Sequence, residues 1–330
     1  NLIGTILFMI VFYSINAFVN FGVLQDMATP AGIAVIHSAF NIIATLVLLP
    51  FGDMLVKMAC ATVRDTKEEK VISAEDQEFM ILESRFLSNP GIAIEQSKTA
   101  ARKMAEQSKN ALKLSFGLLD TFQEENAFRV EKIEAKVDRY EDELGTYLIK
   151  LNQKELSVED SHSLSIMLHC IGDFERISDH ALSIMKSAKE MWEKNAVFSP
   201  QAVKELHVME KAVVDIVDKA YTVFANQDIQ LAEEIEPLEE VIDELSRELK
   251  RRHVNRLRAG ECTIEMGFIL SDVTTSLERI ADHCSNIGVC VTQVREDLYD
   301  THSHLDSVKN APGELFHHEL EVARVNYMLP

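Results

Sequence analysis

A duplicated acidic motif is the sequence feature that most limits how this chain can fold. Residues 175–180 read Glu-Arg-Ile-Ser-Asp-His, and residues 278–283 read Glu-Arg-Ile-Ala-Asp-His, an offset of 103 residues. A second match lies upstream, where the acids of residues 131–138 recur at 236–243 with an offset of 105. Two matches at nearly constant spacing indicate an internal repeat. The chain is therefore expected to contain two similar structural units in tandem.

Both units are predicted to be helical. From about residue 90 the apolar residues follow helical spacing, glycines are few, and no proline occurs between Pro90 and Pro200. Pro237 is expected to kink the fifth helix or to start its main part. We predict an all-α fold with two tandem three-helix bundles, about 90–192 and 200–294. Their expected helices are 90–122, 125–152, 158–192, 200–225, 228–257 and 262–294.

Each repeat carries two E-x-x-x-D pairs, one on each of two helices. Residues four apart share one helical face, so the four carboxylates of a repeat converge if the two helices pack together. Like charges at this spacing repel, and a bound metal ion that prefers oxygen ligands would remove the cost. The predicted ligands are Glu134, Asp138, Glu175 and Asp179 in the first repeat, and Glu239, Asp243, Glu278 and Asp282 in the second.

The sequence leaves open whether these acids bind a metal and which metal they would bind. Exposed, solvated acids on helix surfaces are the plain alternative to metal ligands. The metal is undetermined among Fe, Mn, Mg, Ca and Zn, although the scarcity of Cys and His beside the pairs disfavours a closed structural zinc site.

The first sixty residues have a different composition from the rest. Residues 2–24 and 31–49 contain no charged side chain, and each run is close to the roughly 20 residues that cross a bilayer. Two transmembrane helices are therefore predicted, with a buried soluble hairpin as the alternative. Basic residues follow the second run, so the positive-inside rule places the chain from about residue 53 onward in the cytoplasm of an inner (plasma) membrane protein.

Three polar residues fall inside the second apolar run. His37, Ser38 and Asn41 lie on nearby faces of one helix. Polar groups inside a membrane form hydrogen bonds between helices or line a transport path, and the sequence leaves both roles open.

Composition and missing motifs exclude several functions. The chain has 330 residues and a net charge of −20, which argues against nucleic-acid binding. Its five cysteines form no C-x-x-C pair, so a disulfide or zinc framework is not expected. No arrangement of a nucleophile with a base and no glycine-rich phosphate loop is found, so we predict no enzymatic activity. Because the chain starts with Asn inside an apolar run, it is expected to be a fragment of a longer protein.

The repeated E-R-I-x-D-H with its upstream E-x-x-x-D resembles the PhoU family, the regulators associated with phosphate uptake, over about residues 95–294. The resemblance implies multinuclear iron or zinc clusters on the eight acids named above. Residues 1–5, His37-Ser38-Ala39-Phe40-Asn41 and Pro50-Phe51 are similar to the end of the membrane domain of bacterial Na/phosphate cotransporters, which commonly carry a PhoU-like domain at the C-terminus.

These resemblances imply a domain order and two functions. Residues 1–58 would end the cotransporter membrane domain, 59–89 would form a helical linker, 90–295 the PhoU-like domain, and 296–330 a tail. The first function is a sodium-dependent phosphate symporter fragment with a regulatory PhoU-like domain. Its partners would be membrane lipid, inorganic phosphate, Na⁺ as coupling ion and a protein of phosphate signalling. The cotransporter's Q-S-S-S motifs are absent here and are expected upstream. The alternative is a membrane-anchored PhoU-like regulatory protein that does not transport.

Overall fold

The structure is a computed structural model of the 330-residue chain. It describes residues 78–295 and 314–330 and, before residue 78, only residues 9, 12–14, 16–18, 33–34, 37–38, 40–43 and 45. Contacts divide the chain into two units, residues 1–72 and 73–330. Each unit is described by itself below.

The described residues of the first unit are helical and mostly exposed. Most residues of the two predicted transmembrane runs, 2–24 and 31–49, lie outside the described part of the chain. Where the chain is described, none of its helices combines the length and the apolar character that crossing a membrane requires. This finding contradicts the predicted location of a multi-pass plasma-membrane protein with a cytoplasmic part from about residue 53. An apolar run is a necessary feature of a membrane span and not a sufficient one, because buried helices have the same composition.

The second unit begins with two short 3₁₀ helices and a bundle of three α-helices. The 3₁₀ helices are η3 (Met80–Leu82) and η4 (Ser84–Ser88), and the bundle consists of α5 (Pro90–Asp120), α6 (Glu124–Leu151) and α7 (Val158–Glu193). Ser157 caps α7, since its Oγ accepts a hydrogen bond from the Asp160 N–H at 3.1 Å. The Tyr140 hydroxyl of α6 donates to Glu78 Oε1 at 2.6 Å, which attaches the entering segment to the first bundle.

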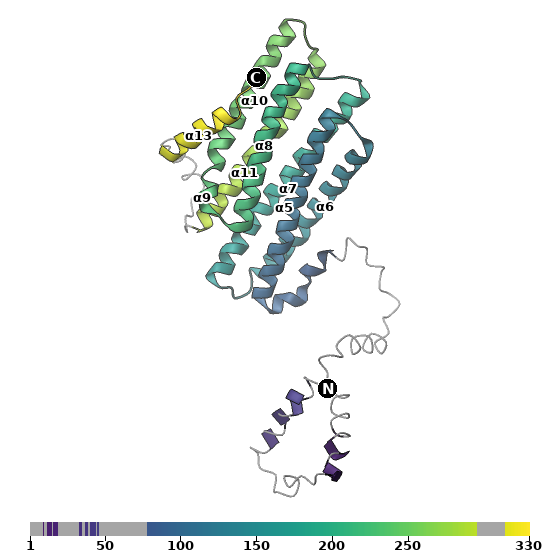
Figure 1. Ribbon diagram of the computed structural model, residues 1–330, viewed down its shortest axis with the longest axis vertical. Helices are drawn as coiled ribbons and strands as arrows, with labels where there is room; N and C mark the ends of the chain where they lie inside the picture. Colours follow the sequence, from purple (N-terminus) through teal and green to yellow (C-terminus); the bar gives the residue numbers. More distant parts are fainter. Residues whose placement is uncertain are drawn as a thin grey trace. The chain divides into compact units, whose positions relative to one another are not determined.

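The second bundle repeats this arrangement. It consists of α8 (Pro200–Asn226), the four-residue helix α9 (Ile229–Ala232), α10 (Ile235–Arg258) and α11 (Ile264–Arg295). Ser199 caps α8 ahead of Pro200, a residue suited to the first turn of a helix. The ribbon in Figure 1 shows the long helices of both bundles running nearly side by side.

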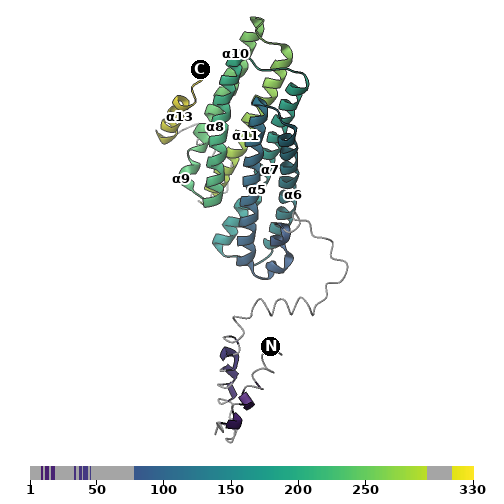
Figure 2. The ribbon, with the colours of Figure 1, turned by 45° about the vertical axis from the view of Figure 1, so that its right-hand side comes forward.

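A last helix, α13 (Glu314–Asn326), packs on α10. The Arg324 guanidinium donates to the Glu244 carboxylate of α10 at 2.5–3.0 Å. The Tyr327 hydroxyl, just after α13, donates to Asp215 Oδ2 of α8 at 2.9 Å. The C-terminal segment therefore contacts two helices of the second bundle (Figure 2).

The two bundles share one hydrophobic core. Helix α7 packs against α11, and α5 contacts α8, so both bundles bury apolar side chains in their common boundary. Phe174 of α7 meets Phe224 of α8 edge to face, with ring centroids 5.0 Å apart. Both rings are buried, at 2% and 6% exposed. The bundles are therefore parts of one folded body.

The all-α tandem prediction is confirmed for the described residues, and helix ends differ from the expected ones by about two residues. The expected fifth helix, 228–257, is the exception, because it divides into α9 and α10. Pro237 lies at the third position of α10, in the first turn, where its missing N–H costs no hydrogen bond. The tail predicted for 296–330 contains the helix α13.

Removing the ring of Phe174 should destabilise both bundles together. We expect Phe174→Ala to lower the free energy of unfolding by about 3–5 kcal/mol, because it leaves a cavity at the shared core. Phe268→Ala is the matched control, since that ring is 69% exposed and should cost much less. Urea unfolding followed by circular dichroism measures both. Equal effects of the two substitutions would contradict a common core.

Candidate metal centre

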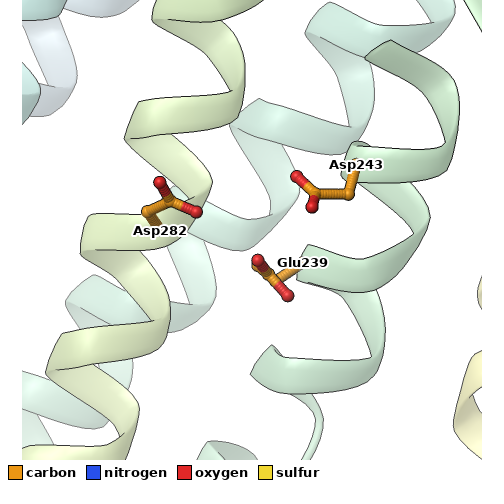
Figure 3. A group of neighbouring side chains, drawn as sticks. All are labelled: Glu239, Asp243 and Asp282. Carbon is orange, nitrogen blue, oxygen red and sulfur yellow. The ribbon is translucent and has the colours of Figure 1, made fainter. Parts of the chain in front are cut away.

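Three carboxylates converge between α10 and α11 in the second bundle. Glu239 and Asp243 lie one turn apart on α10, and Asp282 faces them from α11 (Figure 3). One carboxylate oxygen from each residue can be chosen so that all three lie within 4.8 Å of one another. Glu239 is buried, whereas the other two residues are partly exposed, so the group opens toward solvent on one side.

The fourth predicted ligand of this repeat, Glu278, is close but has other partners. Its Oε2 accepts a hydrogen bond from Ser246 Oγ at 2.9 Å and lies 3.4 Å from Lys250 Nζ. Neither Ser246 nor Lys250 of α10 is among the residues predicted from the sequence to form the site. Their spacing could have identified them, because Ser246 lies three residues after Asp243 and Lys250 lies seven after it, on the same helical face.

The electrostatics of the second cluster favour a cation. Burial raises the pKa of Asp243, and the negative charges of Glu278, Asp282 and Glu240 raise it further, against the opposing effect of Arg247. Its Oδ1 is buried and has no hydrogen-bond partner among the described residues. An ionised Asp243 is therefore poorly compensated by the protein itself.

The corresponding acids of the first bundle lie between α6 and α7. Burial raises the pKa of Glu134, and the charges of Asp179 and Asp138 add to the effect. Burial raises the pKa of Glu175 to about 7, again with contributions from Asp179 and Asp138. These effects show that the four predicted acids share one region. Within the described residues, however, only the second bundle brings three ligand oxygens within 4.8 Å.

The two motif arginines make the same contact in both repeats. Arg176 Nη1 lies 3.2 Å from Asp179 Oδ2, and Arg279 Nη1 lies 3.2 Å from Asp282 Oδ2. Both arginines are well exposed, at 60% and 62% of their side chains. Each one partly neutralises the outer acid of its cluster, which limits the net charge left for a metal.

The two motif histidines meet where α7 packs on α11. The rings of His180 and His283 lie with their centroids 5.8 Å apart. His283 Nδ1 lies 2.9 Å from Asp173 Oδ1, and the Asn286 amide donates to the same oxygen at 3.2 Å. Burial lowers the pKa of His180, and the neighbouring His283 lowers it further. These histidines therefore belong to the boundary between the bundles and not to the acidic clusters.

The predicted polar residues of the second apolar run belong to the first unit, residues 1–72. His37, Ser38 and Asn41 are helical and exposed. The backbone oxygen of Asn41 accepts a hydrogen bond from Thr45 Oγ1 at 2.8 Å. A role of these residues in a transport path stays a prediction.

The fold and its acidic pairs define a class of proteins built from tandem three-helix bundles. The PhoU domain model matches residues 101–188 and 206–291, together more than half of the chain. The chain therefore belongs to the PhoU domain family, as the repeated motif indicated. The two matched regions correspond to the two bundles.

Several individual proteins are similar to this chain. The phosphate-specific transport system accessory protein PhoU homolog 1 of Thermotoga maritima is 30% identical over 115 residues, which are 35% of this chain and 49% of that protein. The chain thus spans about half the length of this relative. The corresponding PhoU homolog of Deinococcus radiodurans is 23% identical over 160 residues, which are 48% of this chain and 74% of that protein.

Two crystal structures share the fold. PhoU from Pseudomonas aeruginosa has a TM-score of 0.53 at 20% identity, covering 68% of this chain and 99% of that one. The phosphate transport system regulatory protein PhoU from Streptococcus pneumoniae has a TM-score of 0.58 at 17% identity, covering 64% and 100%. These comparisons concern the PhoU part of the chain, and the predicted resemblance of residues 1–58 to Na/phosphate cotransporters is not shown by them.

The raised pKa of Glu175 predicts how the stability of the protein depends on pH once a chelator has removed any metal. Because its folded-state pKa, about 7, lies above the ordinary value of 4.5, its contribution to stability is present below about pH 4.5 and is lost as the pH rises through 7. Glu175→Gln should therefore be more stable than wild type at pH 8 and similar to it near pH 4. Urea unfolding at several pH values tests this.

The control for that experiment is Glu106→Gln, an exposed acid on α5. It should keep the wild-type dependence of stability on pH. If Glu175→Gln also kept that dependence, the Glu175 carboxylate would not be destabilised by burial and by its neighbours.

Proposed function

We propose that this chain is an accessory regulator of phosphate transport that binds divalent metal ions at its acidic clusters. Membership of the PhoU family supports the regulatory role, together with the similarity to accessory proteins of phosphate-specific transport systems. The observation that carries the metal part is the convergence of Glu239, Asp243 and Asp282 within 4.8 Å.

The residues of the second cluster fit an oxygen-preferring metal. All three candidate ligands are carboxylates, and the buried Asp243 Oδ1 has no hydrogen-bond partner in the described part of the chain. Iron, manganese and zinc all accept carboxylate oxygens. A metal bound there would supply positive charge that offsets the mutual repulsion of the acids. Because the ligands come from α10 and α11, the protein's own contribution is to hold these two helices at a fixed separation.

The first cluster is proposed as a second, weaker site. Glu134, Asp138, Glu175 and Asp179 perturb one another's protonation, but their oxygens do not form as tight a group. Because of this difference, we expect metal ions to bind to the cluster of the second bundle at lower concentration than to that of the first.

Regulation would proceed by contact with a protein of phosphate transport and not by catalysis. The accessory role named for the relatives implies a protein partner for them, and we extend this role to the present chain. A sodium symporter role for residues 1–58 is not included, because the family match falls on residues 101–188 and 206–291.

Metal content tests the clusters directly. The full chain, purified without chelator, should contain iron, manganese or zinc by elemental analysis. Asp243→Asn should weaken metal binding in the second bundle by about ten-fold or more, since it removes a ligand, and should leave the first bundle unchanged. Glu106→Gln, an exposed acid outside both clusters, should have no effect. Metal-free protein that also shows no thermal shift with these ions would leave the acids as plain surface charges.

Phosphate uptake tests the regulatory role. In cells from which the gene is deleted, uptake of labelled phosphate should no longer respond normally to phosphate supply, and the wild-type chain should restore the response. Asp243→Asn combined with Glu239→Gln should restore it only in part if bound metal is required. Unaltered uptake in the deletion strain would remove the regulatory proposal and leave the metal sites to be judged by metal content alone.

A further inference from the structure

Three of the four cysteines in the described part of the chain lie on the two helices that join the bundles. Cys170 lies on α7, and Cys284 and Cys290 lie on α11. All three are free thiols. Cys170 and Cys284 are completely buried, whereas Cys290 is partly exposed. The boundary between the bundles therefore contains thiols that differ in their access to solvent.

Polar contacts fix how α7 and α11 are aligned. Near the start of α7, Arg295 Nη1 lies 2.7 Å from Glu159 Oε1. Farther along α7, the Asn286 amide donates to Asp173 Oδ1 at 3.2 Å. Residue numbers thus rise along α7 as they fall along α11, so the two helices are antiparallel.

This alignment places Cys170 and Cys290 at the same level of the helix pair. Cys170 precedes Asp173 by three residues and Cys290 follows Asn286 by four. Each cysteine is therefore about one helical turn from the Asp173–Asn286 contact, in the same direction and on the face that makes this contact. Hydrogen bonding with the Cys290 thiol, together with burial, raises the pKa of Cys170. Both observations indicate that the two sulfur atoms face each other between α7 and α11.

The two thiols differ in how easily an oxidant reaches them. Oxidation of a cysteine needs access to the sulfur atom, and Cys290 is the member of the pair with exposed surface. Cys170 is shielded from the oxidant but lies beside Cys290. An accessible thiol next to a second, resolving thiol is the arrangement of redox-sensing cysteines.

We propose that Cys290 and Cys170 form a reversible disulfide when a hydroperoxide such as hydrogen peroxide oxidises the protein. In the first step the Cys290 sulfur attacks one peroxide oxygen, the O–O bond breaks, and the products are a sulfenic acid and water. In the second step the Cys170 sulfur attacks the Cys290 sulfur, and the S–O bond breaks. The departing hydroxide takes the Cys170 proton and leaves as water. Two thiols thus lose two electrons and two protons, and one peroxide becomes two water molecules.

The disulfide would join the two bundles covalently across their shared core. Its two residues lie 120 positions apart, so it would close a long loop in the unfolded chain and stabilise the folded state relative to it. It would also restrict movement of α7 relative to α11. The disulfide needs neither bound metal nor the proposed regulatory role, and a dithiol reductant would reverse it by thiol–disulfide exchange.

The test uses the full chain with Cys60→Ser and Cys262→Ser, which leaves the three thiols of the boundary, and with a chelator that prevents metal-catalysed oxidation. After treatment with hydrogen peroxide, the intact mass should fall by two hydrogen atoms. Digestion without reductant should yield two peptides joined through Cys170 and Cys290. The midpoint of thermal unfolding should rise by about 5–10 °C, and dithiothreitol should reverse all three changes.

Three further substitutions in this parent distinguish the roles of the thiols. Cys290→Ala should abolish the disulfide and leave no sulfenic acid. Cys170→Ala should leave a sulfenic acid at Cys290, which dimedone traps. Cys284→Ala is the matched control, because Cys284 is as completely buried as Cys170, and it should form the disulfide as the parent does. Each variant should keep the circular dichroism spectrum of the parent.

The mass and peptide map of the parent decide the outcome even if a variant folds poorly. Oxidation of Cys290 to sulfinic acid without a disulfide would show that Cys170 does not reach it, and the proposal would be wrong. A parent that does not react with peroxide, or a disulfide that persists in Cys170→Ala, would equally overturn it. Because metal is absent throughout, none of these results bears on the metal clusters or on phosphate regulation.

Discussion

The packing of α7 on α11 is the interaction on which the rest of the molecule depends. A three-helix bundle buries one face of each helix. Helices α7 and α11 each have a further apolar face, which must also be shielded from water. Each bundle provides that cover for the other, so Phe174, Phe224 and their neighbours form one core. The long helices α6 and α10 are then fixed against α7 and α11, which places every E-x-x-x-D pair opposite another one.

This rigid arrangement explains how the protein can hold so many acids close together. Carboxylates on a flexible chain would separate to relieve their repulsion, whereas those on packed helices remain where the core keeps them. The energy of packing is large enough to tolerate a few raised pKa values, such as those of Glu134, Glu175 and Asp243. Arg176 and Arg279 contact two of these acids at positions that the fold fixes, and the proposed metal ions would bind acids held in the same way.

The sequence was a good guide to whatever depends on local periodicity. Helix ends and the paired acids follow from spacing along one helix, and the repeat of residues 175–180 at 278–283 correctly indicated two bundles. The spacing of Ser246 and Lys250 places them on the Asp243 face of α10, but that they contact Glu278 of α11, and so make the two clusters unequal, follows only from tertiary packing. The approach of Asp120 to His207 joins residues 87 apart and has no local signal. The membrane location was wrong because an uncharged run specifies composition and not the environment around it.

The contact between Asp173 of the first repeat and His283 of the second has no counterpart with the two repeats exchanged. Exchange of the two repeats would pair Ser276 with His180, since both positions are offset by 103 residues. A serine hydroxyl is neutral and cannot replace a carboxylate beside an imidazole. The two repeats are therefore inequivalent in charge at their shared boundary, although both form three-helix bundles. A protein partner that recognises charged side chains near this boundary would therefore distinguish the two repeats, as it would distinguish two different subunits.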